Sequence, residues 1–209
     1  MAASVSAGFM FAVSADASAG ELAPRTHSLQ PPQERHGHAQ ITLRHESGSD
    51  HAAGDSGTTG WSVSADGVKT WLGPLARNHV TGTVTYPTDP PVGGPHNPVW
   101  LDCNGEVYTE PVRNENAVHS LEHGAVWVTY NSKASKADVT ALAAKVRKTP
   151  YTMMSPYEHQ KDPIMLTAWG HQRTVTSASD PNVETFFAAY AQGRQTPEPG
   201  APCTGGTMK

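Results

Sequence analysis

The spacing of apolar and polar positions along the second half of the chain switches between the period of a strand and that of a helix. AVWVTY (125–130) is almost continuously apolar and rich in β-branched and aromatic residues, which predicts a buried strand. SKADVTALAAKVRKT (135–149) repeats its apolar residues on one face, as an amphipathic helix does. HVTGTVTY (79–86) alternates and predicts a further strand. The patterns predict a domain built from both kinds of element.

Further strands are expected on either side of these runs. VWLDCNGEVYTEPV (99–112) predicts a hairpin, because the dipeptide Asn104-Gly105 readily supplies the positive φ of a tight turn. YTMMS (151–155) predicts a short strand, and IMLTAWGHQRTVT (164–176) predicts a longer one.

Two more helices complete the prediction. A short helix is expected to be capped by Asn114 or Asn116 and to run through His123, with Gly124 ending it. DPNVETFFAAYAQG (180–193) predicts a final helix with a proline in its first turn. Strands and helices alternate irregularly, so the predicted fold class is α+β, with a single mixed or antiparallel sheet and about three helices.

The first 60 residues differ in composition from the rest of the chain. Residues 1–21 are small and apolar and contain an A-x-A-like triplet, Ala15-Asp16-Ala17, which is typical of a signal peptide or anchor remnant, although the positively charged start is missing. A flexible N-terminus is the alternative interpretation. Residues 22–60 are polar, hold five histidines, and have too little apolar surface to fold, which predicts a disordered linker. The α+β domain is therefore expected to span 61–209.

Composition narrows the class of function. The hydrophobic fraction of 37% and the mean hydropathy of -0.48 fit one domain with a polar extension. The net charge of -4 and the scattered Lys and Arg give no basic footprint, so nucleic acid is not an expected partner. Eleven histidines are many for 209 residues, and they are the feature of the composition that points to chemistry.

The two cysteines, Cys103 and Cys203, are widely separated. They suit either one disulfide in an exported protein or two unrelated thiols in a cytosolic one. The tail TPEPGAPCTGG has no core-forming residues and would otherwise have nothing to hold it, which favours the disulfide and an extracytoplasmic location.

Four histidines outside the linker suggest a metal site. His119 and His123 are four residues apart, so they lie on one face of the predicted helix. His96 follows a Pro/Gly loop that would hold it with little freedom, and His79 lies on the preceding strand as a reserve ligand. Met154, next to Met153 at a strand end, is the expected soft fourth donor.

Ligand type then selects the metal. Imidazole suits both copper and zinc, whereas a thioether favours copper, so copper is the expected ion and zinc the alternative. HSLEH also matches the H-x-x-E-H pattern of some zinc peptidases, in which Glu122 would activate water and Glu184 would be the downstream carboxylate ligand. Glu122 could equally orient a ligand histidine.

Five motifs in this order carry a resemblance to a family: RNHV, PPVGGPHNPVW, ENAVHSLEHGAVWVTY, TAWG and TPEPGAPCTGG. From about Gly67 onward the chain resembles the DUF 3105 family, which is common in actinobacteria. The resemblance implies an exported or membrane-anchored single domain of unassigned function. It marks these residues as motif positions: His79, His96, His119, Glu122, His123 and Trp127.

Three classes of function are compatible with these patterns. The first is an exported protein that binds and handles copper, with or without catalysis. The second is an envelope interaction domain whose histidines are structural, with unknown protein partners and anchoring through the N-terminus. The third is a zinc-dependent hydrolase. Whether the protein is an enzyme is left undecided.

Overall fold

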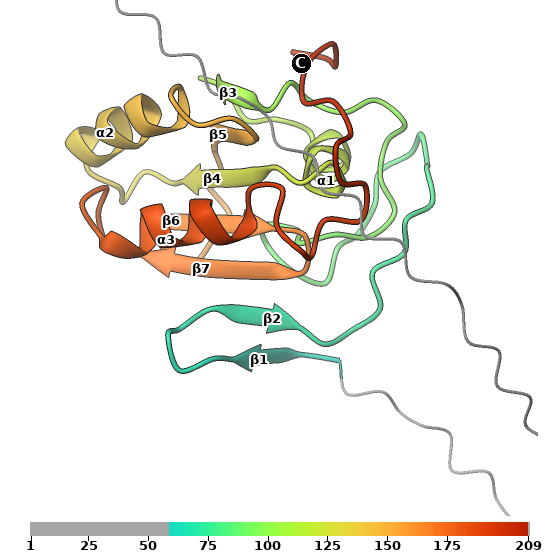
Figure 1. The fold of residues 1–209 in the computed structure, drawn as a ribbon, viewed down its shortest axis with the longest axis horizontal. Helices are drawn as coiled ribbons and strands as arrows, with labels where there is room; N and C mark the ends of the chain where they lie inside the picture. The colour runs from blue at the N-terminus through green and yellow to red at the C-terminus, as the bar shows by residue number, and fades with distance from the viewer. Residues whose placement is uncertain (1–58, 209) are drawn as a thin grey trace, which may run out of the picture. The chain divides into compact units, whose positions relative to one another are not determined.

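A seven-stranded mixed sheet organises residues 59–208, the part of the chain that the computed structural model describes (Figure 1). The strand order is β1-β2-β7-β6-β4-β5-β3, in which β4, β5 and β3 are parallel and the other pairs antiparallel. The strands are β1 (Trp61–Val63), β2 (Lys69–Trp71), β3 (Asn104–Val107), β4 (Val126–Tyr130), β5 (Thr152–Pro156), β6 (Ile164–Ala168) and β7 (His171–Val175). The fold class expected from the sequence is confirmed.

Two hydrophobic cores lie on the two faces of the sheet, because successive side chains of a strand point to opposite sides. On β4, Val126 and Val128 join one core, which is covered by α2 (Lys136–Val146) and α3 (Pro181–Tyr190). Trp127 joins the other core, which is covered by α1 (Asn114–Glu122). The candidate ligands of α1 are therefore on the opposite face from α2 and α3.

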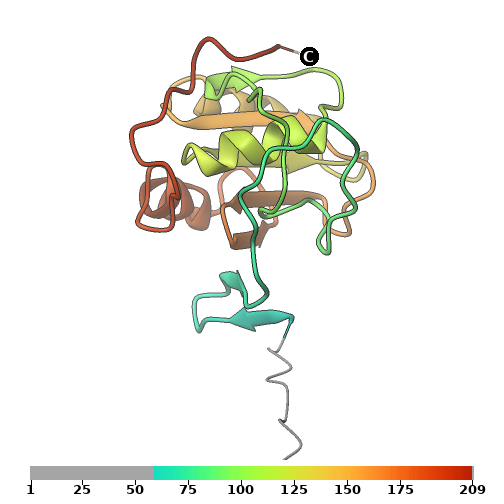
Figure 2. The same ribbon diagram turned by 90° about the vertical axis from the view of Figure 1, so that its right-hand side faces the viewer.

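The hairpin of β1 and β2 extends the sheet at the edge beyond β7 (Figure 2). These two short strands were not predicted. The sequence 164–176 forms β6 and β7, which pair antiparallel around Trp169 and Gly170, rather than one long strand. Gly170 has a φ of +71°, which a turn between adjacent strands requires and glycine adopts at little cost.

Two strand predictions are wrong. The segment 79–86 forms only a single bridge, between His79 and His96, and 80–86 is not a strand. No hairpin forms around Asn104-Gly105; instead β3 pairs with β5 in parallel. Gly105 does have a positive φ, but it lies where the pairing of β3 with β5 changes register. The chain before β3 pairs with the C-terminal tail instead, through Leu101 and Thr207.

The caps of α1 differ in part from the prediction. Arg113 occupies the N-cap position and makes no side-chain capping bond, so neither Asn114 nor Asn116 caps the helix. At the other end the prediction is confirmed, because Gly124 follows the helix with a φ of +93°. A Cβ there would lie 2.5 Å from the side chain of Gln192, so the site also excludes a larger residue.

The C-terminal tail runs from α3 past α1 to the chain that precedes β3 (Figure 1). Cys103 and Cys203 form the expected disulfide and are both buried. Next to it, Cys103 N–H donates to the Cys203 carbonyl over 2.8 Å. A disulfide fits an oxidising environment.

The apolar segment 1–21 and nearly all of the linker 22–60, with its histidines, lie outside the described residues. Within the described residues, no helix is long and apolar enough to cross a membrane.

Replacing Cys103 and Cys203 together by serine should lower the free energy of unfolding by about 2 to 5 kcal/mol, because the bridge closes a long loop and restricts the unfolded chain. The cysteines are 100 residues apart. Urea titration of the oxidised wild type and the double variant measures the difference. A loss no larger than that of an exposed control, Lys133→Ala, would contradict the prediction.

Candidate metal centre

Helix α1 is buried although most of its side chains are polar. Its buried polar residues are Glu115, Asn116, His119, Ser120 and Glu122. A buried polar group costs free energy unless it is hydrogen-bonded. The backbone of 97–101 supplies partners: Ser120 bonds both the N–H and the carbonyl of Leu101, and Asn116 donates to the Val99 carbonyl over 2.6 Å. The helix and this segment are thus locked together.

The segment that follows the Pro/Gly loop brings His96 to the same place. His96 is fully buried. Its backbone forms a parallel bridge with His79, in which Val80 N–H donates to the His96 carbonyl over 2.7 Å and His96 N–H donates to the Asn78 carbonyl over 3.2 Å. The bridge places His79 beside His96, with ring centroids 5.0 Å apart.

Four side chains converge where these elements meet. They belong to His79, His96, His119 and Glu122, and one ligand atom from each lies within 4.8 Å of the others. Donors of a tetrahedral site with bonds of 2.0–2.1 Å lie about 3.3 Å apart, so small side-chain movements would complete the geometry. We call these four residues the histidine cluster.

The backbone fixes the tautomers of the two buried histidines in the cluster. His96 Nδ1 lies 2.8 Å from the Gly94 carbonyl, and His119 Nδ1 lies 2.6 Å from the Asn97 carbonyl. A carbonyl only accepts, so each Nδ1 carries a proton, and each Nε2 of a neutral ring carries a lone pair. This arrangement is the one usual for metal-binding histidines.

The contact between His96 and Glu122 is chemically incomplete. His96 Nε2 lies 2.8 Å from Glu122 Oε2, both side chains are almost wholly buried, and no hydrogen bond of suitable geometry reaches this Nε2 within the described residues. A lone pair facing a carboxylate is repulsive. Either a proton or a metal ion must lie there, and this is the strongest indication of a ligand site in the described part of the chain.

Arg77 orients the other oxygen of this carboxylate. Its Nε donates to Glu122 Oε1 over 2.7 Å, and its Nη2 lies 3.3 Å from Glu198 Oε1. Glu122 Oε1 is thereby engaged, which leaves Oε2 for the cluster. Arg77, Glu198 and the ligand role of Glu122 were not predicted from the sequence; RNHV and TPEPG were motif segments, but nothing in them assigned these contacts.

Burial keeps His119 neutral. Removal from water is the largest cause, and it lowers the pKa of His119 to about 4, with the neighbouring histidines adding to the shift and the Asn97 carbonyl opposing it. A metal ligand must be an unprotonated imidazole, so His119 is ready to ligate at neutral pH.

His123 lies next to the cluster rather than within it. Its ring packs edge-on against His119 with centroids 4.5 Å apart, but its Nδ1 donates to the Pro202 carbonyl over 2.7 Å and its Nε2 faces Glu198 at 3.8 Å. The structure therefore brings together His79, His96 and His119 of the predicted ligands. His79, the reserve ligand, lies in the cluster, and His123 does not.

Met154 is not brought to the cluster. Its side chain is fully buried in the core on the α2 and α3 face, as strand alternation requires once Met153 faces α1. Met153 packs in the second core with Trp127 and Leu121. The fourth donor near the histidines is the carboxylate of Glu122.

The zinc-peptidase pattern is not reproduced. Glu122 is paired with Arg77 rather than free to activate water, and Glu184 lies on the surface of α3 in an ion pair with Lys145.

Three of the five tryptophans lie on the face of the sheet that α1 covers or beside the cluster. Trp100 packs on His119 and His123, and Trp169 packs on His96. Trp127 packs instead on Tyr157 in the core. Trp100 and Trp169 therefore shield imidazoles, whereas Trp127, the motif tryptophan of β4, packs only within the core.

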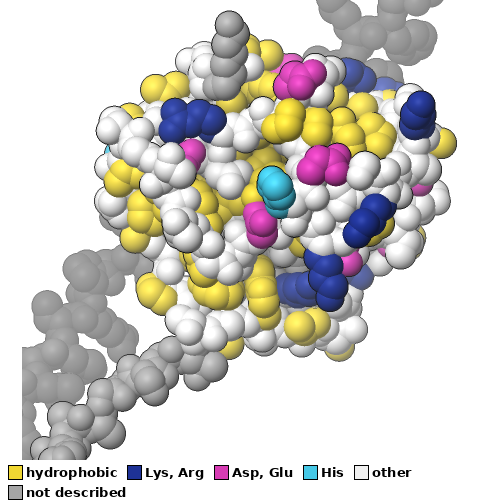
Figure 3. Space-filling view, turned by 180° about the vertical axis from the view of Figure 1, so that it is seen from behind, with side chains coloured by type: hydrophobic (Ala, Val, Ile, Leu, Met, Phe, Trp, Pro, Cys, Tyr) yellow, Lys and Arg dark blue, Asp and Glu magenta, His cyan; other side chains and the backbone are white. Residues whose placement is uncertain are grey.

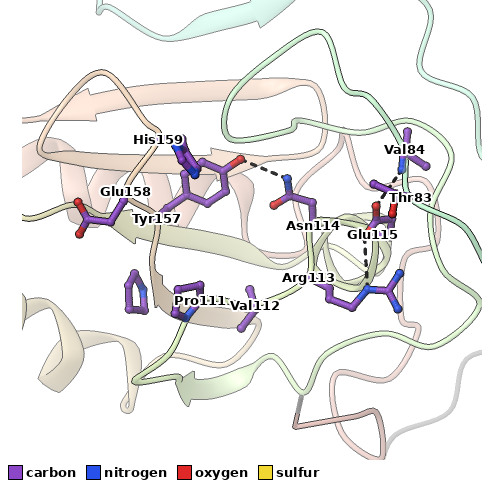
Figure 4. A pocket seen from close by; sticks show the side chains of 11 residues that line it. Thr83, Val84, Pro111, Val112, Arg113, Asn114, Glu115, Tyr157, Glu158 and His159 are labelled. Atoms are coloured by element: carbon purple, nitrogen blue, oxygen red, sulfur yellow. Dashed lines mark hydrogen bonds and ion pairs between the residues drawn. The ribbon is translucent and has the colours of Figure 1, made fainter.

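A separate pocket of about 420 Å³ opens at the N-terminal end of α1 (Figure 4). Several of its polar groups already have partners: Glu115 pairs with Arg113 and accepts from Val84 N–H, and Asn114 donates to Tyr157. None of the histidine cluster lines it. On the face shown in Figure 3, acidic and basic side chains are interspersed rather than gathered by sign.

Comparison with known proteins identifies a family, but it assigns no activity. The family model described as a protein of unknown function (DUF3105) matches residues 79–205, more than half of the chain. The match includes all four residues of the histidine cluster and begins just after Arg77. No curated protein and no solved structure matches the chain.

The metal-free protein should lose stability as the pH falls from 6.5 toward 4. The pKa of His119 is about 4 in the folded protein and 6.5 as its ordinary value, so the unfolded chain binds the proton more readily in this interval. His119→Asn keeps a donor for the Asn97 carbonyl but does not titrate. Urea titrations in the presence of a chelator should show a shallower pH dependence for this variant; parallel curves would contradict the assignment.

Proposed function

Because the chain belongs to the DUF3105 family, whose members carry no assigned activity, we propose from the site itself that this protein binds a divalent transition-metal ion through His79, His96, His119 and Glu122. The observation that carries the proposal is the unsatisfied contact between His96 Nε2 and Glu122 Oε2. An ion between them would turn the repulsion of two lone pairs into two coordinate bonds. The fixed tautomers of His96 and His119 support the same assignment.

Copper(II) is the ion proposed to bind most tightly. Three imidazoles suit copper and zinc, and the affinity of such sites rises to copper and falls again at zinc. With a carboxylate rather than a thioether as fourth donor, the preference for copper no longer rests on a soft ligand and depends on the affinity order alone. Zinc remains the alternative ion, since a site of three histidines and one carboxylate is within its usual ligand range.

The proposed role is the binding and handling of this metal outside the cytoplasm. The buried disulfide supports an oxidising compartment, because such bonds are rare where thiols are kept reduced. Anchoring of the protein to a membrane through its N-terminal segment is part of the same proposal. We propose no catalytic activity, because among the described residues near the cluster we identify no general base or nucleophile that is free of other contacts.

Titration of tag-free protein with copper(II), in competition with a chelator of known affinity, tests the site. The wild type should bind one ion tightly. His96→Ala, His119→Ala and Glu122→Gln should each weaken this binding by more than about a hundredfold, since even partners outside the ligand shell contribute roughly 10- to 100-fold.

His159→Ala is the matched control, because His159 is an exposed histidine in the pocket at the other end of α1. Its affinity should equal that of the wild type, which separates the cluster from loose binding by other histidines. If the three variants bind like the control, the histidines are structural, and the contact between His96 and Glu122 is an ion pair that holds a proton.

Arg77→Met should weaken binding by about 10- to 100-fold while one ion still binds. The variant keeps the bulk of the side chain but frees Glu122 Oε1, so the carboxylate loses its fixed orientation. Loss of the positive charge acts in the opposite direction, but Arg77 is half exposed and paired with Glu198, which screens that effect. An affinity that rises would show that repulsion, not orientation, is the main effect of Arg77.

A further inference from the structure

His79 differs from the other members of the histidine cluster in two respects. It is exposed, whereas His96, His119 and Glu122 are buried. The other three are each held by a hydrogen bond: the rings of His96 and His119 donate to the carbonyls of Gly94 and Asn97, and the Glu122 carboxylate accepts from Arg77. Within the described residues, no hydrogen bond holds the ring of His79, which packs on the rings of His96 and His119.

An open hollow of about 520 Å³ begins at His79. It is lined by His79, Val80, Thr81, Gly82 and Pro98. Its volume is in the range of sites for small molecules, roughly 300 to 1,000 Å³. Apart from His79, its lining side chains carry no ionisable group, so the walls would repel neither a cationic nor an anionic complex.

We infer that this hollow is the port through which the metal ion is exchanged, and that it receives a small chelating ligand of about amino-acid size with amine and carboxylate donors. This inference rests on the proposed metal site. A ligand of this class fits the volume and offers donors that can replace an imidazole. A macromolecular donor would need to reach a ligand atom inside the hollow, between Val80 and Pro98.

The exchange proceeds by substitution at the metal. When the ion leaves, a donor atom of the incoming chelator forms a bond to it as the bond to His79 breaks, and the remaining three bonds follow. No electron is transferred, and the ion keeps its charge. His79 is the first ligand displaced because its ring can turn toward solvent, whereas the other three would have to break a buried hydrogen bond or ion pair as they move.

Gly82 allows the port to be blocked without touching a ligand. A Cβ built on this residue meets nothing within 4 Å, and its φ lies outside the left-handed region, so a side chain can be added. Because Gly82 lines the hollow, Gly82→Phe is expected to narrow it. Ala137→Phe, at an exposed position of α2, is the matched control for an added aromatic ring.

The measurement is stopped-flow transfer of copper(II) from the loaded full-length protein to nitrilotriacetate, followed at increasing chelator concentration. Gly82→Phe should slow transfer by about tenfold, a barrier about 1.4 kcal/mol higher, with an equilibrium affinity close to that of the wild type. Ala137→Phe should transfer at the wild-type rate. His79→Ala should bind the ion more weakly and release it faster, because the ligand that the chelator would displace first is already absent.

The outcomes separate the two proposals. If the wild type binds copper tightly but Gly82→Phe and Ala137→Phe transfer it at equal rates, the port is overturned and the metal site stands. A rate that does not depend on chelator concentration also overturns the port, since it means that the ion dissociates unaided. If the wild type binds no ion, both proposals fall together.

Discussion

The buried polar side chains of α1 dictate how the neighbouring segments pack. Helix α1 places Asn116, His119 and Ser120 out of water, so each must find a hydrogen-bond partner. The backbone of 97–101 provides all three partners, which fixes the path of this segment over the helix. Because His96 immediately precedes it, the same network that makes α1 stable also brings the third imidazole to the cluster.

The C-terminal tail closes the other side of the helix through the disulfide. The disulfide ties Cys203 to Cys103. Just before it, the tail makes three hydrogen-bonded contacts: the Pro202 carbonyl with His123, and Glu198 with Glu122 and with Arg77. His123 is thus used to hold the tail. His123, the second histidine of HSLEH, therefore has a structural contact here, although it is spaced four residues from His119 as a second metal ligand would be.

The centre of the cluster combines fixed geometry with an unmet electrostatic requirement. Gly94, Asn97 and Arg77 each use a hydrogen bond to turn one donor toward the same point. Lone pairs that face one another, three of them on buried side chains, are costly without a cation. A proton would relieve only the contact between His96 and Glu122, whereas a metal ion bound by all four residues would satisfy all four donors. His79 is the exposed member of the cluster, and the proposed exchange of a metal ion takes place on its side.

Sequence patterns were enough to predict the fold class, the buried strand at AVWVTY, the end of α1 at Gly124 and the disulfide, because period, turn chemistry and cysteine number are local or countable. It also pointed to His79, His96 and His119. Three features became visible only in the folded chain: Met154 faces the other core, His123 bonds Pro202, and Glu122, oriented by Arg77, completes the cluster. These outcomes depend on strand register and on partners up to 79 residues away, which no local pattern encodes.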